Sequence, residues 1–288
     1  MDYIMRDDYI QGLDSRGFHR LHYTDWGDPA NPRAVICVHG LTRNCRDFDA
    51  LATALQNDLR VVSISIAGRG KSDWLPNADD YSYPQYMADI TALIARITAT
   101  GTIDISWVGT SMGGMLGMLL AARPETPIRR LVLNDIGTVV PKESMARIGK
   151  YAGMDPRFNS YAEIEQYVRT VSAPFGPLTD AQWQHMTAHN TRQHDDGRWG
   201  MNYDPAIALP FRKAIDRDIV LWNYYDAVAC PTLLLRGELS DVLPRTNALE
   251  MTQRGPRPRL IEFAGIGHAP ALMADDQIAA IRGFLLQT

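Results

Sequence analysis

The sequence predicts an α/β fold, a mostly parallel sheet with helices on both faces and a helical cap insertion. Up to about residue 136, short apolar runs alternate with segments of helical periodicity, and this rhythm resumes at residue 231. Between about 139 and 225 the chain has the pattern of helices and loops, with no convincing strand. We therefore expect a core of residues 1–136 and 226–288, interrupted by a helical cap segment of residues 137–225.

The first half of the chain supplies most of the expected sheet. One or two short strands are expected within residues 9–26, because turn signals divide that stretch. The remaining apolar runs are β-branched or bounded by glycine, which favours buried strands. They are expected at 34–38, 60–66, 103–108 and 130–134, with helices at 45–55, at 86–98 and from residue 112 to about 123.

The second half begins with the cap segment, where residues 161–171 and 180–189 are amphipathic and predict helices. Further buried strands are expected at 231–235 and 259–263. A last helix is expected at about 274–287. This return to alternating strands and helices predicts that the chain re-enters the same sheet after the cap segment.

Composition limits the classes of function. The chain has 288 residues, 45% of them hydrophobic and 22% charged, and a net charge of −4, which argues against nucleic acid as a partner. The charged N-terminus lacks the apolar core of a signal peptide, and no apolar run approaches a membrane span. Three cysteines fit neither a disulfide framework nor a zinc site. We expect a cytoplasmic protein, a monomer or homodimer, that acts on a small molecule.

The stretch Gly109-Thr110-Ser111-Met112-Gly113 carries the strongest functional signal. It fits G-x-S-x-G, with a strand-like run before it and a small, apolar, helix-like run after it. Such a strand-to-helix turn exposes the serine hydroxyl, and small residues are needed because the strand and helix approach closely. The motif predicts that Ser111 is a nucleophile.

A serine nucleophile needs a base and an acid that orients the base. His268 lies in a glycine-rich loop directly after the last expected strand, where open α/β sheets place ligand chemistry. Asp241 follows the strand at 231–235 in the same way, and we expect it to be the acid. Glu238, in the same loop, and Asp135, which ends the strand before the cap segment, are the alternatives.

The negative charge that develops on the substrate carbonyl oxygen needs fixed hydrogen-bond donors. In this design two backbone amides form the oxyanion hole, one after the nucleophile and one in the loop after an earlier strand. These are the N–H groups of Met112 and of Leu41, which follows His39-Gly40. His39 itself is interpreted as a structural residue that holds this loop.

Taken in order, these motifs resemble the α/β-hydrolase superfamily, in particular its capped cytosolic bacterial esterases and C–C hydrolases. The resemblance rests on His39-Gly40, the Gly68–Asp73 loop, the serine turn, Gly237…Asp241 and Gly267-His268, which span almost the whole chain. One departure is Ser65, where many relatives have aspartate. This departure puts the anchoring of the Gly68–Asp73 loop in question.

The resemblance implies a serine carboxylesterase acting on small to medium acyl esters, including hydroxyalkanoate oligomers or lactones, through an acyl-serine. Two other functions remain open: a C–C hydrolase of a ring-fission dienoate, whose carboxylate Arg43 or Arg192 would bind, and a non-catalytic ligand receptor. Arg43 and Trp222 are candidate substrate-binding residues.

No cofactor and no metal ion are expected. His185 and His189 are four residues apart on an expected helix, but with His194, Asp195 and Asp196 they match no known ligand motif.

Overall fold

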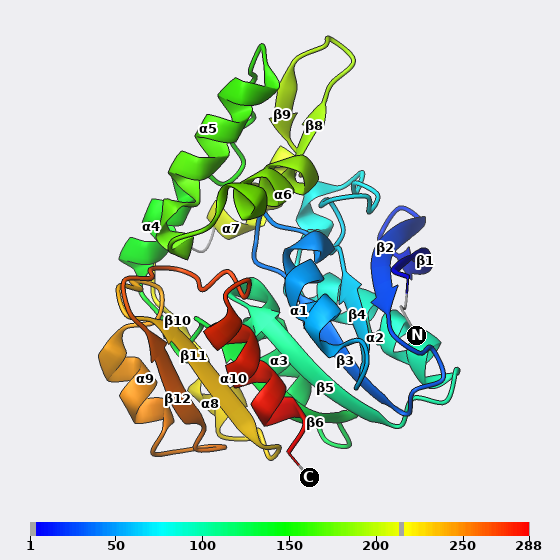
Figure 1. The fold of residues 1–288 in the computed structure, drawn as a ribbon, viewed down its shortest axis with the longest axis vertical. Coiled ribbons are helices and arrows are strands. Elements are labelled where there is room, and N and C mark those ends of the chain that lie inside the picture. The colour runs from blue at the N-terminus through cyan, green and yellow to red at the C-terminus, as the bar shows by residue number, and fades with distance from the viewer. Residues whose placement is uncertain (1–3, 213–215, 288) are drawn as a thin grey trace.

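The computed structural model describes residues 4–212 and 216–287 and shows the expected α/β fold (Figure 1). Within the described residues, an eight-stranded sheet has the order β1-β2-β4-β3-β5-β6-β11-β12. Its strands are β1 (Arg6–Leu13), β2 (Phe18–Trp26), β3 (Arg33–Val38), β4 (Arg60–Ile64), β5 (Asp104–Thr110), β6 (Ile128–Asn134), β11 (Thr232–Gly237) and β12 (Arg259–Phe263). β1 and β2 form an antiparallel hairpin that continues antiparallel onto β4, whereas the pairs from β4 to β12 are parallel.

Helices cover both faces of this sheet, which gives the molecule two apolar layers. Leu51 and Leu55 of α1 (Asp49–Leu55) share one layer with Ile281 of α10 (Asp275–Leu285). Leu93 of α2 (Tyr83–Thr98) and Leu116 of α3 (Met112–Ala121) belong to the other layer. Two further helices, α8 (Trp222–Tyr225) and α9 (Arg245–Met251), and two 3-10 turns, η1 (Cys45–Phe48) and η2 (Ala78–Asp80), complete this part of the chain.

The segment between β6 and α8 adds no strand to the main sheet in its described residues. It holds the helices α4 (Lys142–Gly149), α5 (Tyr161–Val171), α6 (Asp180–Asn190) and α7 (Ala208–Arg212), with the 3-10 turns η3 (Ala173–Phe175) and η4 (Pro205–Ile207). In Figure 1 these elements stand together at one end of the sheet.

The expectation that this segment contains no strand is wrong. Two short antiparallel pairs occur in it, β7 (Val139–Val140) with β10 (Ile219–Val220) and β8 (Thr191–Gln193) with β9 (Trp199–Met201). Strands of two or three residues are too short to show an alternating pattern in sequence. In the part of the chain that is described, no helix combines the length and the apolar character needed to cross a bilayer.

Candidate active site

Ser111 occupies the turn between β5 and α3, as the sequence predicted. Its φ of 52° and ψ of −115° lie outside the regions that non-glycine residues normally adopt. The neighbouring glycines make this turn possible: a Cβ on Gly113 would lie 1.9 Å from the Val38 oxygen, and one on Gly109 would lie 2.3 Å from the Gly113 oxygen. The turn therefore requires glycine at both positions because strand and helix are in backbone contact.

His268 and Asp135 complete a chain of hydrogen bonds with Ser111. The Nε2 atom of His268 lies 2.9 Å from Ser111 Oγ, and its Nδ1 lies 2.7 Å from Asp135 Oδ2. Asp135 is fully buried directly after β6. Its carboxylate also accepts the Gly237 N–H at 2.9 Å and the Ser240 hydroxyl at 2.6 Å. These donors, Gly237 at the end of β11 and Ser240 in the loop that follows it, fix the carboxylate that contacts the imidazole.

The prediction that Asp241 contacts the histidine is wrong, and Asp135, one of the two alternatives, takes that place. The Asp241 side chain is 44% exposed and forms a bidentate ion pair with Arg147 of α4. Its Oδ2 lies 2.6 Å from Arg147 Nε, and its Oδ1 lies 2.8 Å from Arg147 Nη2. In the loop after β11 it is Ser240 that turns inward, so Asp241 points toward the cap segment. The other alternative, Glu238, accepts the Gly265 N–H at 2.9 Å.

The sequence contained one indication of Asp135. It directly follows an expected strand, and it is the first acidic residue after Ser111 in such a position. What the sequence did not show is the strand order. β6 lies between β5 and β11, so the end of β6 is beside the serine turn.

Hydrogen bonds from a side chain and from the backbone hold the histidine loop in place. Asn134 donates from its side-chain amide to Thr110 Oγ1 at 3.0 Å and to the Pro270 oxygen at 2.9 Å, which joins this loop to β5. The N–H of Gly267 donates to the oxygen of Pro174, in η3, at 2.7 Å. His268 is thus held from the sheet and from the cap segment.

The two expected oxyanion-hole residues lie beside Ser111. Leu41 and Met112 both line the cavity onto which Ser111 opens. Met112 is the first residue of α3, so its N–H belongs to the first turn, where amides have no partner within the helix. The Leu41 oxygen accepts Arg69 Nε at 2.9 Å, which fixes the loop that carries the second predicted donor.

The structure explains how the Gly68–Asp73 loop is anchored although Ser65 replaces the aspartate that many relatives have. Ser65 accepts the Cys45 N–H on its hydroxyl at 3.2 Å, and its carbonyl accepts the Ser72 hydroxyl at 2.6 Å. The fully buried Arg69 donates to the Ala67 oxygen at 2.6 Å and the Tyr86 hydroxyl at 2.9 Å. Backbone and tyrosine oxygens therefore provide the anchoring.

His39 is a structural residue, as interpreted from sequence. It is fully buried, its Nε2 accepts the Ile66 N–H at 3.0 Å, and its Nδ1 lies 2.6 Å from the Gly40 oxygen. Burial lowers the pKa of His39 to about 3, so the ring stays neutral and joins the loops after β3 and β4.

Ser111 opens onto an apolar cavity of about 320 Å³. The core contributes Met115 and Ile136, and the segment between β6 and α8 contributes side chains from five elements. Those from this segment are Val140, Met145, Ile148, Ile207, Pro210 and Ile219. No charged side chain lines the cavity within the described residues. The site therefore combines a hydrogen-bonded serine with a space suited to an apolar group.

The predicted substrate-binding residues lie outside this cavity. Trp222 is a packing residue, with the Arg254 guanidinium 4.1 Å from its ring centre and Tyr225 against its edge. Arg43 is held by both oxygens of Asp47 at 2.7 Å, but it borders a second, smaller space beside His268. Arg192 lies over the Trp74 ring at 4.5 Å.

The site and fold agree with comparisons to known proteins. The profile of the alpha/beta hydrolase family matches residues 35–281, so the chain belongs to the α/β-hydrolase family. A 3-hydroxybutyrate-oligomer hydrolase from Cupriavidus necator is 43% identical over 279 residues, which cover 94% of each chain. The expected general activity is confirmed: the chain is an esterase, and its substrate is an ester.

Two solved structures resemble the whole chain. A protein from Rickettsia typhi has a TM-score of 0.91 at 30% identity and covers 99% of both chains. An alpha/beta hydrolase from Novosphingobium aromaticivorans has a TM-score of 0.86 at 37% identity and covers 99% of this chain and 98% of its own.

Proposed function

We propose that the chain is a serine carboxylesterase in which Ser111 is the nucleophile, His268 the general base and Asp135 the residue that orients the base. The observation that carries this proposal is the 2.9 Å contact between Ser111 Oγ and His268 Nε2 at the wall of an apolar cavity. A hydroxyl becomes a nucleophile when a base at this distance accepts its proton.

The reaction proceeds in two halves. Ser111 Oγ attacks the ester carbonyl as its proton passes to His268 Nε2, and the amides of Leu41 and Met112 bind the oxyanion. The imidazolium then protonates the departing alkoxide, which leaves an acyl-serine. Water attacks this ester as His268 takes one of its protons, and the acid is released while Ser111 recovers its hydrogen. Asp135 stabilises the imidazolium in both halves.

The substrate we propose is an ester of a small to medium acyl group, specifically an oligomer of a 3-hydroxyalkanoic acid. The cavity of about 320 Å³ has room for a short acyl chain and is lined by methionine and isoleucine side chains. The Cupriavidus necator relative is named for hydrolysis of 3-hydroxybutyrate oligomers. Residues 137–225 act as a cap that closes this cavity.

The leaving alcohol lies on the side of His268, because that residue protonates it. A smaller space of about 50 Å³ occurs there, bordered by Arg43, Arg147 and Tyr151. In a linear hydroxyalkanoate oligomer the leaving half ends in a free carboxylate. Arg147 is 41% exposed, and its Asp241 partner engages only Nε and one terminal nitrogen. We propose that Arg147 binds this carboxylate.

A substrate panel tests the proposal. Purified protein is given p-nitrophenyl esters of increasing chain length, 3-hydroxybutyrate dimer and trimer, and a ring-fission dienoate. We expect turnover of the short esters and the oligomers but not of the dienoate. Rapid dienoate cleavage without ester turnover would instead assign C–C hydrolysis. Tight binding of a small ligand without turnover would assign a receptor.

The Ser111→Ala variant is the control for the chemistry. We expect it to lower kcat by about 10⁶-fold, because it removes the nucleophile on which the base acts. Mass spectrometry of the wild-type protein during p-nitrophenyl ester turnover should show the acyl group on Ser111. An unchanged rate in the variant would remove Ser111 from the mechanism.

A further inference from the structure

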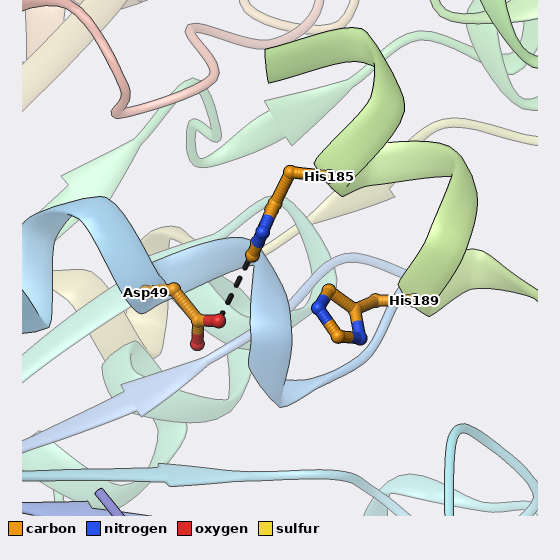
Figure 2. Close-up of side chains that lie close together, drawn as sticks. All are labelled: Asp49, His185 and His189. Carbon is orange, nitrogen blue, oxygen red and sulfur yellow. Dashed lines mark ion pairs between the residues drawn. The ribbon is translucent and has the colours of Figure 1, made fainter. Parts of the chain in front are cut away.

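Three potential metal ligands meet where α6 contacts α1, away from Ser111. His185 and His189 lie one turn apart on α6 and face Asp49 at the start of α1 (Figure 2). One ligand atom from each of the three lies within 4.8 Å of the others. The His185 Nε2 atom is 3.4 Å from Asp49 Oδ2, and the two imidazole centres are 4.6 Å apart.

This cluster has unused bonding capacity. Asp49 is only 8% exposed, yet its Oδ1 atom is buried without a hydrogen-bond partner. A buried carboxylate oxygen without a partner is costly, so such an atom points to a missing ligand. The ring of His189 has no hydrogen bond among the described residues, although it lies against the His185 ring.

We propose that Asp49, His185 and His189 form a binding site for a divalent transition-metal ion such as Zn²⁺. Two imidazoles at positions i and i+4 of a helix lie on one face and can share an ion. Two nitrogen donors and one carboxylate oxygen are the ligand types that Zn²⁺ accepts, and water would complete the tetrahedral shell. Mg²⁺ and Ca²⁺ prefer oxygen ligands alone and are not expected to compete.

Arg46 is the natural competitor for this ion. Its guanidinium donates to Asp49 Oδ2 at 2.7 Å and therefore occupies the carboxylate in the structure. Lys71 adds a second positive charge near His189, and Asp47 adds a negative one. The Arg46 side chain is 20% exposed, so it can turn toward solvent when a metal ion takes its place.

The site joins two parts of the chain that are distant in sequence. Asp49 belongs to a helix packed on the main sheet, whereas both histidines belong to a helix of the 137–225 segment. Ordinary contacts already bring them together, since His185 Nε2 lies 3.1 Å from the backbone oxygen of Arg46. A bound ion would add a bridge between the segment and the core. Sequence alone offered Asp195 and Asp196 as the acids, because Asp49 is far away along the chain.

Isothermal titration of the purified, chelator-treated protein with Zn²⁺ tests the site. We expect one ion per chain, and a higher midpoint temperature of unfolding when the ion is bound. His189→Gln should weaken binding by about 100-fold or more, since even residues outside the ligand set change metal affinity by 10–100-fold. The matched control is His194→Gln, which removes an imidazole in another part of the same segment and should leave the affinity unchanged.

A third variant guards against misfolding as an explanation. Arg46→Met keeps the apolar stem and removes the competing charge, so it should tighten Zn²⁺ binding, and a damaged site cannot produce that result. Co²⁺ should give the visible absorption of a tetrahedral site in the wild-type protein and lose it in His189→Gln. Equal Zn²⁺ binding by wild type and His189→Gln, or no binding at all, would overturn the proposal.

Discussion

The carboxylate of Asp135 holds the imidazole of His268, with Oδ2 2.7 Å from Nδ1, while the Ser240 hydroxyl donates to the same oxygen at 2.6 Å. The carboxylate that contacts His268 thus follows β6, the strand beside β5, which leads into Ser111. The loop that carries Asp241 contributes a hydroxyl in its place. This arrangement separates the roles of two aspartates that follow neighbouring strands.

Replacing each aspartate by its amide distinguishes these roles. Asp135→Asn should lower kcat by about 10⁴-fold, because the amide cannot stabilise the imidazolium and favours the wrong tautomer. Asp241→Asn should change kcat by less than about threefold, since it breaks only an exposed ion pair. Steady-state hydrolysis of p-nitrophenyl butyrate measures both. Similar losses in the two variants would contradict the assignment of Asp135.

The close contact at Gly113 predicts that adding a single carbon atom there lowers the stability of the fold strongly. Gly113→Ala should lower the free energy of unfolding by about 3 kcal/mol or more, because the new Cβ would lie 1.9 Å from the Val38 oxygen. Gly283→Ala is the matched control. Gly283 is in helix α10 with nothing near its Cβ position, so alanine there should stabilise by up to about 1 kcal/mol. Urea denaturation compares the two, and equal stability would refute the steric argument.

The proposed role of Arg147 is tested by comparing KM for two substrates, one with a free carboxylate and one without. Arg147→Met should raise KM for the 3-hydroxybutyrate dimer by about tenfold, the effect of losing one charge-assisted hydrogen bond. KM for the methyl ester of the same dimer should not change, because that substrate has no free carboxylate. Initial rates with the two substrates give the result, and parallel changes in KM would count against carboxylate binding.

Stability should depend on pH through His19, which lies away from the active site. Burial lowers the pKa of His19, but the hydrogen bond and charge of Asp89, 3.1 Å away, and the charge of Asp14 outweigh it and raise the pKa above its ordinary value. A raised pKa means that the protonated ring stabilises the fold below the unfolded pKa, and this contribution is lost as the pH rises through the folded pKa.

His19→Gln should therefore destabilise the protein more at about pH 5, which is below the ordinary histidine pKa, than at alkaline pH, where the ring is neutral in wild type. Denaturation by urea at the two pH values measures the difference between wild type and variant. A difference that does not depend on pH would show that the His19 ring contributes only packing and neutral hydrogen bonds.

The fold was predictable because its elements have strong local patterns. Helix α5 has the expected bounds, and the turn at Ser111 was evident from the glycine spacing together with the strand-like run before it and the helix-like run after it. The choice of acid was not predictable, since Asp135 and Asp241 both follow strands and only the spatial order of β6 and β11 distinguishes them. The role of Trp222 could not be predicted either. Trp222 packs against Arg254, and the sequence does not distinguish such an aromatic residue from one that lines a pocket.

The hydrogen bond from Gly267 to Pro174 connects the proton-accepting loop to a turn outside the sheet. If residues 137–225 move aside to admit a substrate, Gly267, which precedes His268, loses this hydrogen bond. The imidazole then keeps its contact with Asp135, but its loop is held only from the sheet, through the hydrogen bond from Asn134 to Pro270. The position of residues 137–225 and the placement of the His268 loop are therefore coupled through this backbone hydrogen bond.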